Sequence, residues 1–222
     1  MELVKDLKAT GTSTLMYANP GAGKTTALSM LPGKTLIIDV DKGTSVLSDK
    51  PENVDIVRLK PDLSNLKSII DEVKELDYDN VCLDTVSELE KTMLTNYGRI
   101  GKNDGAPEIG HYNKVGFKLA DYIRELRNLT DKGINVIVTA WEDNKEIVEP
   151  SGEKYSVLMP MVRKSSEICG LFDTVARLIV SDKKENAGER FFVLEASANV
   201  FAKDRISKRK FCKVNELIKG EK

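Results

Sequence analysis

A glycine-rich segment between an apolar run and a helix-forming run constrains this chain more than any other feature. It follows the strand-like run Thr14–Ala18. In order it contains Asn19, Pro20, Gly21, Ala22, Gly23, Lys24, Thr25 and Thr26. Gly21 and Gly23 accept backbone angles that other residues resist, so successive backbone N–H groups can wrap around an anion. A helix that begins near Lys24 directs its positive end toward the same anion.

The end of this segment, Gly23-Lys24-Thr25, matches the nucleotide-binding pattern G-x-x-x-x-G-K-[ST] at every position except the first, which is Ala18. Alanine is the least costly replacement for glycine there. In such loops the lysine reaches the β- and γ-phosphates, and the hydroxyl ligates magnesium. We therefore expect Lys24 to hold and activate a nucleoside triphosphate and Thr25 to bind Mg²⁺. The alternative is a structural glycine turn.

A magnesium nucleotide needs a second acidic group, which usually ends an apolar strand. Asp84 follows the apolar run Val81–Leu83, far enough past the loop to leave room for an intervening strand in the sheet. We expect Asp84 to hold a magnesium-bound water. The alternative is an ordinary helix N-cap before Val86, because Asp84 and Thr85 are both good capping residues.

Hydrolysis also requires a carboxylate that orients or deprotonates water. Many NTPases carry a glutamate directly after the magnesium-site aspartate, but here that position is Thr85. The segment 36–43 contains a buried strand that ends in the alternating acids Asp39 and Asp41. Alternate residues of a strand share one face, so both could face the nucleotide crevice. We favour Asp41 as the base. Glu88 is a weaker candidate, and an Asp-rich turn is the structural alternative.

Strand-like and helical patterns alternate through the first 140 residues, which predicts right-handed crossovers and a mostly parallel sheet with helices on both faces. The expected strands are 14–18, 35–40, 54–59, 81–83 and 136–140, and the expected helices are 25–31, 63–76, 86–97 and 112–132. Beyond Ala140 we expect a hairpin of 145–149 and 154–159, a helix at 165–172, and strands at 174–181, 190–196 and 200–203. The fold class is α/β with a C-terminal antiparallel extension, in a single domain over residues 1–222.

The charge is unevenly distributed. The whole chain has 34 Lys+Arg and 35 Asp+Glu, and near-neutrality by itself argues against a nucleic-acid partner. Residues 203–222, however, carry a net charge of +5, which leaves −6 on residues 1–202. We therefore expect a basic tail at 203–222 on an acidic body. Such a tail is either a nucleic-acid contact or an ordinary solvated terminus.

Composition excludes several other classes. With 41% hydrophobic and 31% charged residues, the chain can form a core and is not globally disordered. Its apolar runs are too short to span a membrane, and charges come too early in MELVKDLKATG for a signal peptide, so we expect a cytoplasmic protein. The three cysteines are too widely spaced for a disulfide framework or a zinc knuckle.

These segments together resemble the RecA-like core of P-loop NTPases. Ile38-Asp39-Val40-Asp41 matches the strand that ends in Ile-Asp-x-Glu in recombinases of that class, with Asp in place of Glu, and Leu83-Asp84-Thr85-Val86 matches their magnesium-site strand. The chain looks closest to the phage nucleotide-binding proteins grouped as Sak-type single-strand annealing ATPases, over roughly residues 10–206. For a phage protein the location would be the host cytoplasm.

The resemblance implies ATP hydrolysis, self-association into a ring or filament, and single-stranded DNA binding. Basic residues near the end of such cores reach the neighbouring subunit's nucleotide, and Lys203 and Arg205 match that position. Loops at 99–113 and 142–161 occupy the places of DNA-contacting loops. Trp141 stands where relatives carry a polar γ-phosphate sensor, so either Thr139 or Glu142 takes that role or the coupling is altered. A core position for Trp141 is the structural alternative.

The leading hypothesis is therefore a DNA-stimulated ATPase that assists recombination or strand annealing. A small-molecule kinase is a different possibility, in which an acidic crevice holds the acceptor. A third is a nucleotide-gated binding module with little hydrolysis, which Asp in place of Glu at position 41 would permit.

Overall fold

The computed structural model describes residues 11–182 and 184–218. The N-terminal segment on which the signal-peptide expectation rests, and the last four residues of the predicted basic tail, lie outside this range. No helix within the described residues is long and apolar enough to cross a membrane.

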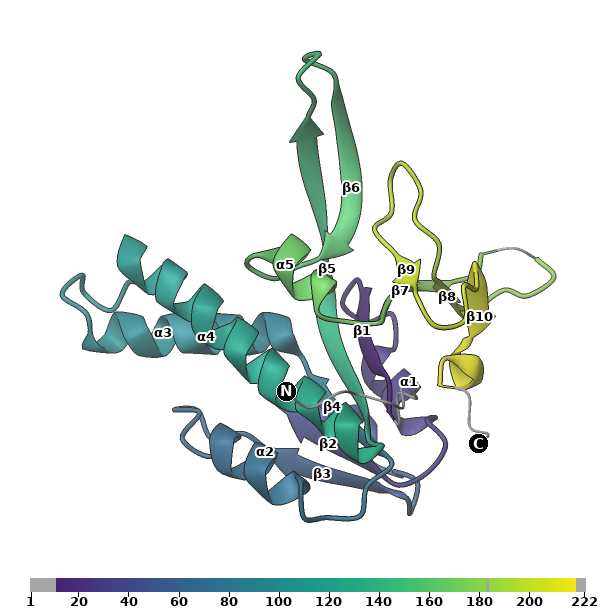
Figure 1. Ribbon diagram of the computed structural model, residues 1–222, viewed down its shortest axis with the longest axis horizontal. Coiled ribbons are helices and arrows are strands. Elements are labelled where there is room, and N and C mark those ends of the chain that lie inside the picture. The colour runs from purple at the N-terminus through teal and green to yellow at the C-terminus, as the bar shows by residue number, and fades with distance from the viewer. Residues whose placement is uncertain (1–10, 183, 219–222) are drawn as a thin grey trace, which may run out of the picture.

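The described strands form one sheet in which six neighbouring strands run parallel (Figure 1). Their order across the sheet is β7-β1-β5-β4-β2-β3. Their bounds are β1 Ser13–Ala18, β2 Thr35–Asp39, β3 Val54–Arg58, β4 Asn80–Asp84, β5 Asn135–Val148 and β7 Thr174–Val180. The predicted α/β class with a mostly parallel sheet is confirmed. β5 lies between β1 and β4, so a strand does separate the glycine-rich loop from Asp84.

Alternate side chains of each strand enter two separate cores, as the two-residue repeat of a strand requires. In β1, Leu15 and Tyr17 belong to one core, whereas Met16 and Ala18 belong to the other. The first core is covered by helices α2 Leu66–Val73, α3 Val86–Ile100, α4 Ile109–Arg127 and α5 Ser165–Gly170. The second is covered by helix α1 Lys24–Ser29 and by the end of the described chain. Short 3-10 turns lie at Gly43–Val46, Asn128–Lys132 and Val214–Glu216.

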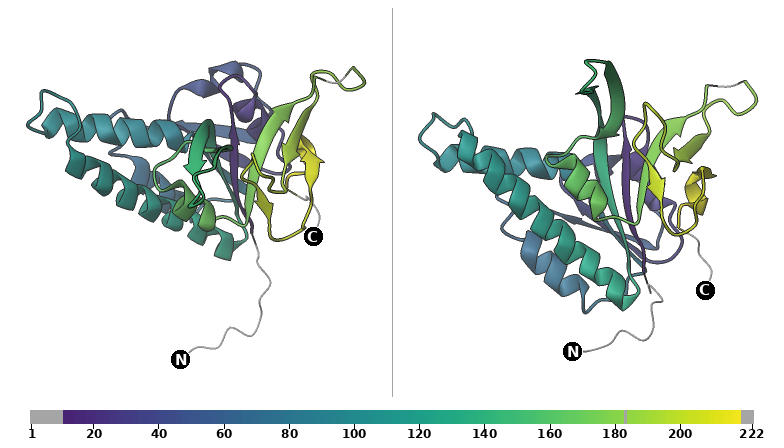
Figure 2. Two further views of the ribbon diagram at one scale, coloured as in Figure 1. Left: turned by 90° about the horizontal axis from the view of Figure 1, so that it is seen from above. Right: turned by 45° about the horizontal axis from the view of Figure 1, so that its top comes forward.

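Helices α3 and α4 pack side by side and extend beyond the sheet (Figures 1 and 2). α4 begins with a capping box in which the Glu108 backbone N–H donates to His111 Nδ1 at 3.1 Å. The buried His111 ring also stacks on Tyr97, with ring centroids 5.3 Å apart. The predicted loop at 99–113 is therefore shorter than expected, because helix capping draws its ends into α3 and α4 and leaves only 101–108 outside them.

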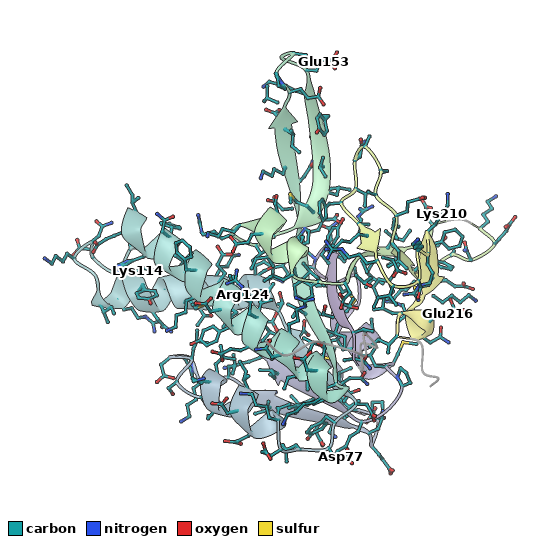
Figure 3. The ribbon with its side chains drawn as sticks, in the orientation of Figure 1. Asp77, Lys114, Arg124, Glu153, Lys210 and Glu216 are labelled. Carbon is teal, nitrogen blue, oxygen red and sulfur yellow. The ribbon has the colours of Figure 1, made fainter. Side chains whose placement is uncertain are left out.

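The first strand of the predicted hairpin is a continuation of a core strand of the sheet. β5 runs without interruption to Val148, so the two strands expected at 136–140 and 145–149 are one, and it pairs antiparallel with β6 Lys154–Pro160. Ala18, the last residue of β1, pairs with Trp141. The rest of β5 therefore projects past the carboxyl edge of the sheet, and Glu153 lies at the tip of this hairpin (Figure 3).

Antiparallel strands complete the other side of the sheet, as predicted. β8 Arg190–Val193 pairs with β7, and β10 Phe211–Lys213 pairs with β8. The strand expected at 200–203 is reduced to β9 Lys203–Asp204, which pairs with the first residues of β7.

The basic segment differs from the predicted solvent-facing tail. Val214, Leu217 and Ile218 are buried in the second core. Arg209 donates from Nε to Asp204 at 2.7 Å and from its terminal nitrogens to the carbonyl oxygens of Glu216 and Leu217. The net charge of the segment did not reveal this packing, because a few apolar residues determine it. Residues 203–218 are part of the domain.

This packing predicts a clear contrast between two substitutions. Leu217→Ala should lower the free energy of unfolding by about 2–3 kcal/mol, because it removes a buried side chain from the core. Phe211→Ala should change it by about 0.5 kcal/mol or less, because Phe211 is 70% exposed. Urea denaturation of both variants gives the comparison. Equal, small effects would mean that the segment does not contribute to the core.

Candidate nucleotide site

The glycine-rich loop has the backbone shape that its sequence predicts. Gly21 and Gly23 adopt φ angles of 79° and 95°, in the left-handed region that disfavours side chains. Ala18 needs no such freedom, since it is the buried last residue of β1. Lys24 Nζ donates to the carbonyl oxygens of Ala18 at 2.9 Å and Asn19 at 3.1 Å. The lysine side chain thus folds back across the mouth of the loop.

Thr25 and Asp84, the two predicted magnesium ligands, are hydrogen-bonded to each other. Thr25 Oγ1 donates to Asp84 Oδ2 at 2.7 Å, and Thr139 Oγ1 on β5 donates to the other carboxylate oxygen. The helix cap that was the alternative for Asp84 is provided by Thr85, whose Oγ1 accepts from the Ser87 backbone N–H at 3.2 Å. A hydroxyl and a buried carboxylate are oxygen donors that suit Mg²⁺.

Burial is the largest cause of the pKa shifts of Asp84 and Lys24. It raises the pKa of Asp84, against the hydrogen bonds from Thr139 and Thr25 and the charge of Lys24, which lower it. Burial also lowers the pKa of Lys24, and the carboxylates of Asp84, Asp41 and Glu142 oppose this shift. Three carboxylates therefore lie close enough to Lys24 to act on its charge. A magnesium–phosphate group would supply charges of both signs to the same space.

Asp39 and Asp41 do not share a strand face, because β2 ends at Asp39. Asp39 is buried, accepts a hydrogen bond from Thr44 Oγ1 and lies 3.5 Å from Arg58 Nε. The expectation that both aspartates share one strand face is therefore wrong, because Asp41 lies beyond the end of β2. Asp39 itself pairs in register with Asp84. Asp41 lies in the exposed loop that follows, where its Oδ1 accepts from the Gly43 backbone N–H at 2.8 Å.

Asp41 and Glu88, the two candidate bases, line the same pocket of about 360 Å³. The pocket lies between the loop after β2 and helix α3, and Lys60 and Arg99 also line it. The described residues that line it include none from the glycine-rich loop. The charge of Asp41, however, acts on Lys24. The assignment of Asp41 as the base remains a prediction.

Glu142 connects the glycine-rich loop to the base of the hairpin. Its Oε1 accepts from Asn19 Nδ2 at 3.1 Å, and Arg177 on β7 donates from Nε to Oε2 at 2.6 Å. The Glu142 side chain is only 5% exposed, so this charge pair is well shielded from water. Of the two sensor candidates, Glu142 contacts the loop directly and Thr139 contacts it through Asp84. Trp141 is half-buried, with Lys91 Nζ 4.0 Å from its ring centroid.

Arg190, at the start of β8, is a loop contact that the sequence did not reveal. Its Nε donates to the Ala22 carbonyl oxygen at 3.0 Å. A Cβ at Gly23 would come within 2.6 Å of the same nitrogen, which gives glycine a second reason to occupy that position. Arg190 has no acidic partner among the described residues. No local motif marks it, because it approaches the loop only through the pairing of β7 and β8.

Lys203 and Arg205 lie at the other end of the sheet from their own glycine-rich loop. Lys203 pairs with Val175, and Val175 pairs with Leu15 near the start of β1, whereas the loop follows the end of β1. Burial and the charge of Arg205 lower the pKa of Lys203. These two residues therefore cannot contact the nucleotide of their own chain, and any role for them in hydrolysis requires a second copy.

Substituting Asp84 should separate stability from nucleotide binding. The folded-state pKa of Asp84 lies above its unfolded value, so the folded protein binds more protons between the two values and loses stability as the pH rises through that interval. Asp84→Asn removes the ionisable group and therefore this loss. The variant should have a higher free energy of unfolding than the wild-type protein at neutral pH, and the difference should become smaller in acid. It should also lose magnesium-dependent nucleotide affinity. Denaturation at several pH values and nucleotide titration test both effects; an Asn variant less stable at neutral pH would contradict the burial account.

Substituting Arg190 tests the contact with the loop. We expect Arg190→Ala to weaken nucleotide binding by about five- to tenfold, as the loss of one hydrogen bond from a charged group predicts, and Arg190→Lys to recover part of it. Arg124→Ala is a matched control, because Arg124 pairs with Asp121 and Glu167 on the surface of α4 and α5 (Figure 3). Titration with a fluorescent nucleotide measures each affinity. Equal affinities in the Arg190 and Arg124 variants would exclude a role for Arg190.

Solved structures of other proteins are similar to this chain. A prototypical ATPase from the type III secretion system of pathogenic bacteria superposes with a TM-score of 0.50 at 17% identity, and the match covers 76% of this chain and 51% of that chain. The chain thus spans about half the length of that ATPase. The KaiC-like protein PH0186 from Pyrococcus horikoshii OT3 superposes with a TM-score of 0.45 at 14% identity, covering 82% and 77% of the two chains. None of the curated proteins matches.

The family assignment rests on sequence. The family model described as "AAA domain" matches residues 10–206, which include the glycine-rich loop, Asp84 and the hairpin. With the fold of RecA-like ATPases, the chain is an ATP-binding P-loop NTPase. The chain belongs to the AAA-domain family.

Proposed function

We propose that this protein is a magnesium-dependent ATPase that acts on single-stranded DNA in recombination or strand annealing. The observation that carries the proposal is the bond between Asn19 of the P-loop and Glu142 at the base of the hairpin. It joins the nucleotide site to a projection that leaves the body at the same edge of the sheet. A direct connection of this kind suits an ATPase in which the bound nucleotide controls the contacts that the hairpin makes.

Each residue has a distinct role in this proposal. The N–H groups of the P-loop and Lys24 hold the β- and γ-phosphates, and Lys24 leaves the carbonyl oxygens of Ala18 and Asn19 to do so. Thr25 and Asp84 would hold Mg²⁺, which neutralises charge on the phosphates when bound. Asp41 accepts a proton from the attacking water, and its exposed loop lets the shorter Asp side chain approach.

Self-association completes the site in this proposal. Lys203 and Arg205 would contact the nucleotide of a neighbouring copy, since their own P-loop lies at the other end of the sheet. A ring or filament places one face of each copy against a different face of the next, as contact between Lys203 and a neighbouring P-loop requires. The resemblance to Sak-type annealing ATPases supports this assembly and the single-stranded DNA partner.

A small-molecule kinase is the alternative that one observation favours. The pocket between Asp41 and Glu88 also contains Lys60 and Arg99, so it offers charges of both signs to a charged acceptor. In that case ATP turnover would depend on the acceptor rather than on DNA.

The decisive experiment measures ATP hydrolysis with and without single-stranded DNA. We expect DNA to raise turnover and Lys24→Ala to abolish it. Asp41→Asn should lower turnover on the order of a hundredfold or more while nucleotide binding persists, because general-base catalysis contributes about that much. Glu88→Gln is the matched control for the base. Loss of turnover in Glu88→Gln alone would move the assignment to Glu88; phosphate transfer to a metabolite without DNA stimulation would contradict the proposed function.

A further inference from the structure

Three aromatic rings on one side of the hairpin base each lie against a cation. Lys91 Nζ is 4.0 Å from the ring centroid of Trp141, and Lys164 Nζ is 3.7 Å from that of Phe117. The third pair is Arg163 and Tyr112, with the guanidinium carbon 4.6 Å from the ring centroid. We call these six residues the ring–cation surface.

The ring–cation surface is assembled from four separate parts of the chain. Lys91 comes from α3, Tyr112 and Phe117 from α4, Trp141 from β5, and the other two cations from the loop after β6. The three cations line one cleft of about 590 Å³ between the hairpin base, α3 and α5. Figure 1 shows these elements meeting beside the hairpin. The surface therefore exists only in the folded protein.

The cations of the cleft are incompletely neutralised. Arg163 pairs with Glu90 and Lys164 with Glu167, but Lys91 and Lys145, which also line the cleft, have no acidic partner among the described residues. Asp143 also lines the cleft, so its four cations face three carboxylates and the lining has a net charge of +1. This charge lies on a body whose residues 1–202 carry a net charge of −6. The cleft thus offers positive charge to a polyanion.

The rings make the surface selective for unpaired bases. Phe117 is 60% exposed, so its ring is accessible to a ligand. Bases of a single strand stack on aromatic faces while nearby cations follow the phosphates. In a duplex the bases are stacked on one another, and the rings cannot reach their faces.

The surface is also connected to the nucleotide site. Ser87 lies in the first turn of α3, directly after Asp84 and Thr85. Its Oγ accepts from the Trp141 backbone N–H at 2.9 Å and donates to the Met161 carbonyl oxygen at 2.7 Å. The same serine thus fastens the base of the hairpin to the helix that follows Asp84.

We propose that the ring–cation surface binds single-stranded nucleic acid, with bases replacing the cations on the rings and the released cations contacting phosphates. This rests on the proposed function, for which the ligand is single-stranded DNA. It assigns binding to α3, α4 and the loop after β6, in addition to the hairpin.

Trp141 provides a direct probe, since it is the only tryptophan in the chain. Oligothymidylate added to the full chain with ATP should quench Trp141 fluorescence as bases stack on the ring, whereas duplex DNA should not. Oligouridylate in a parallel titration distinguishes RNA from DNA. Unchanged Trp141 fluorescence with an oligonucleotide that binds, as fluorescence anisotropy reports, would overturn the proposal.

Substitutions give an independent test. Phe117→Ala should weaken oligothymidylate binding by about tenfold or more, whereas Phe211→Ala, which removes an equally exposed ring from β10, should not. Lys91→Ala should lower the salt dependence of binding by about one phosphate contact. Nucleotide affinity should be unchanged in Phe117→Ala.

The outcomes separate this inference from the proposed function. If the wild-type protein binds the oligonucleotide and Phe117→Ala and Lys91→Ala bind it equally well, the surface is wrong and the ATPase proposal stands. If the wild-type protein hydrolyses ATP but binds no single strand, both the surface and the DNA-directed role are wrong.

Discussion

A single buried carboxylate, Asp84, holds the nucleotide site together. It ends β4, and it receives hydroxyl hydrogen bonds from Thr25 at the start of α1 and from Thr139 on β5. Three elements that are far apart in the chain therefore meet at two oxygen atoms. A buried carboxylate is costly unless its hydrogen bonds are satisfied, so this junction is stable only while all three elements are in place.

Because the burial of Asp84 disfavours its charged form, this site favours a bound cation. Burial raises the pKa of Asp84 and lowers that of Lys24, so both groups are held in surroundings that disfavour their charged forms. A bound magnesium nucleotide brings a cation to the carboxylate and an anion to the lysine, which offsets both penalties together. The free energy that the fold spends on these two charges thus favours occupancy of the site.

The hairpin extends this arrangement to the edge of the molecule. β5 supplies Thr139 to Asp84, Glu142 to the P-loop, and Trp141 to the ring–cation surface within four consecutive positions. A small shift of β5 along its axis would alter all of these contacts. The proposed coupling between the nucleotide and the single strand therefore depends on β5.

Sequence by itself determined the parallel core and the P-loop, since strand alternation, Gly21, Gly23 and the Gly23-Lys24-Thr25 ending are local signals of backbone geometry. It also indicated Asp84, because an acid at the end of an apolar strand downstream of a P-loop is the usual place for a magnesium-site carboxylate. Tertiary structure alone decided that residues 203–218 pack as part of the domain, that β2 ends at Asp39 and leaves Asp41 in a loop, and that Arg190 reaches the P-loop. These depend on strand pairing and on where a strand ends, and both are set by contacts between residues far apart in the chain.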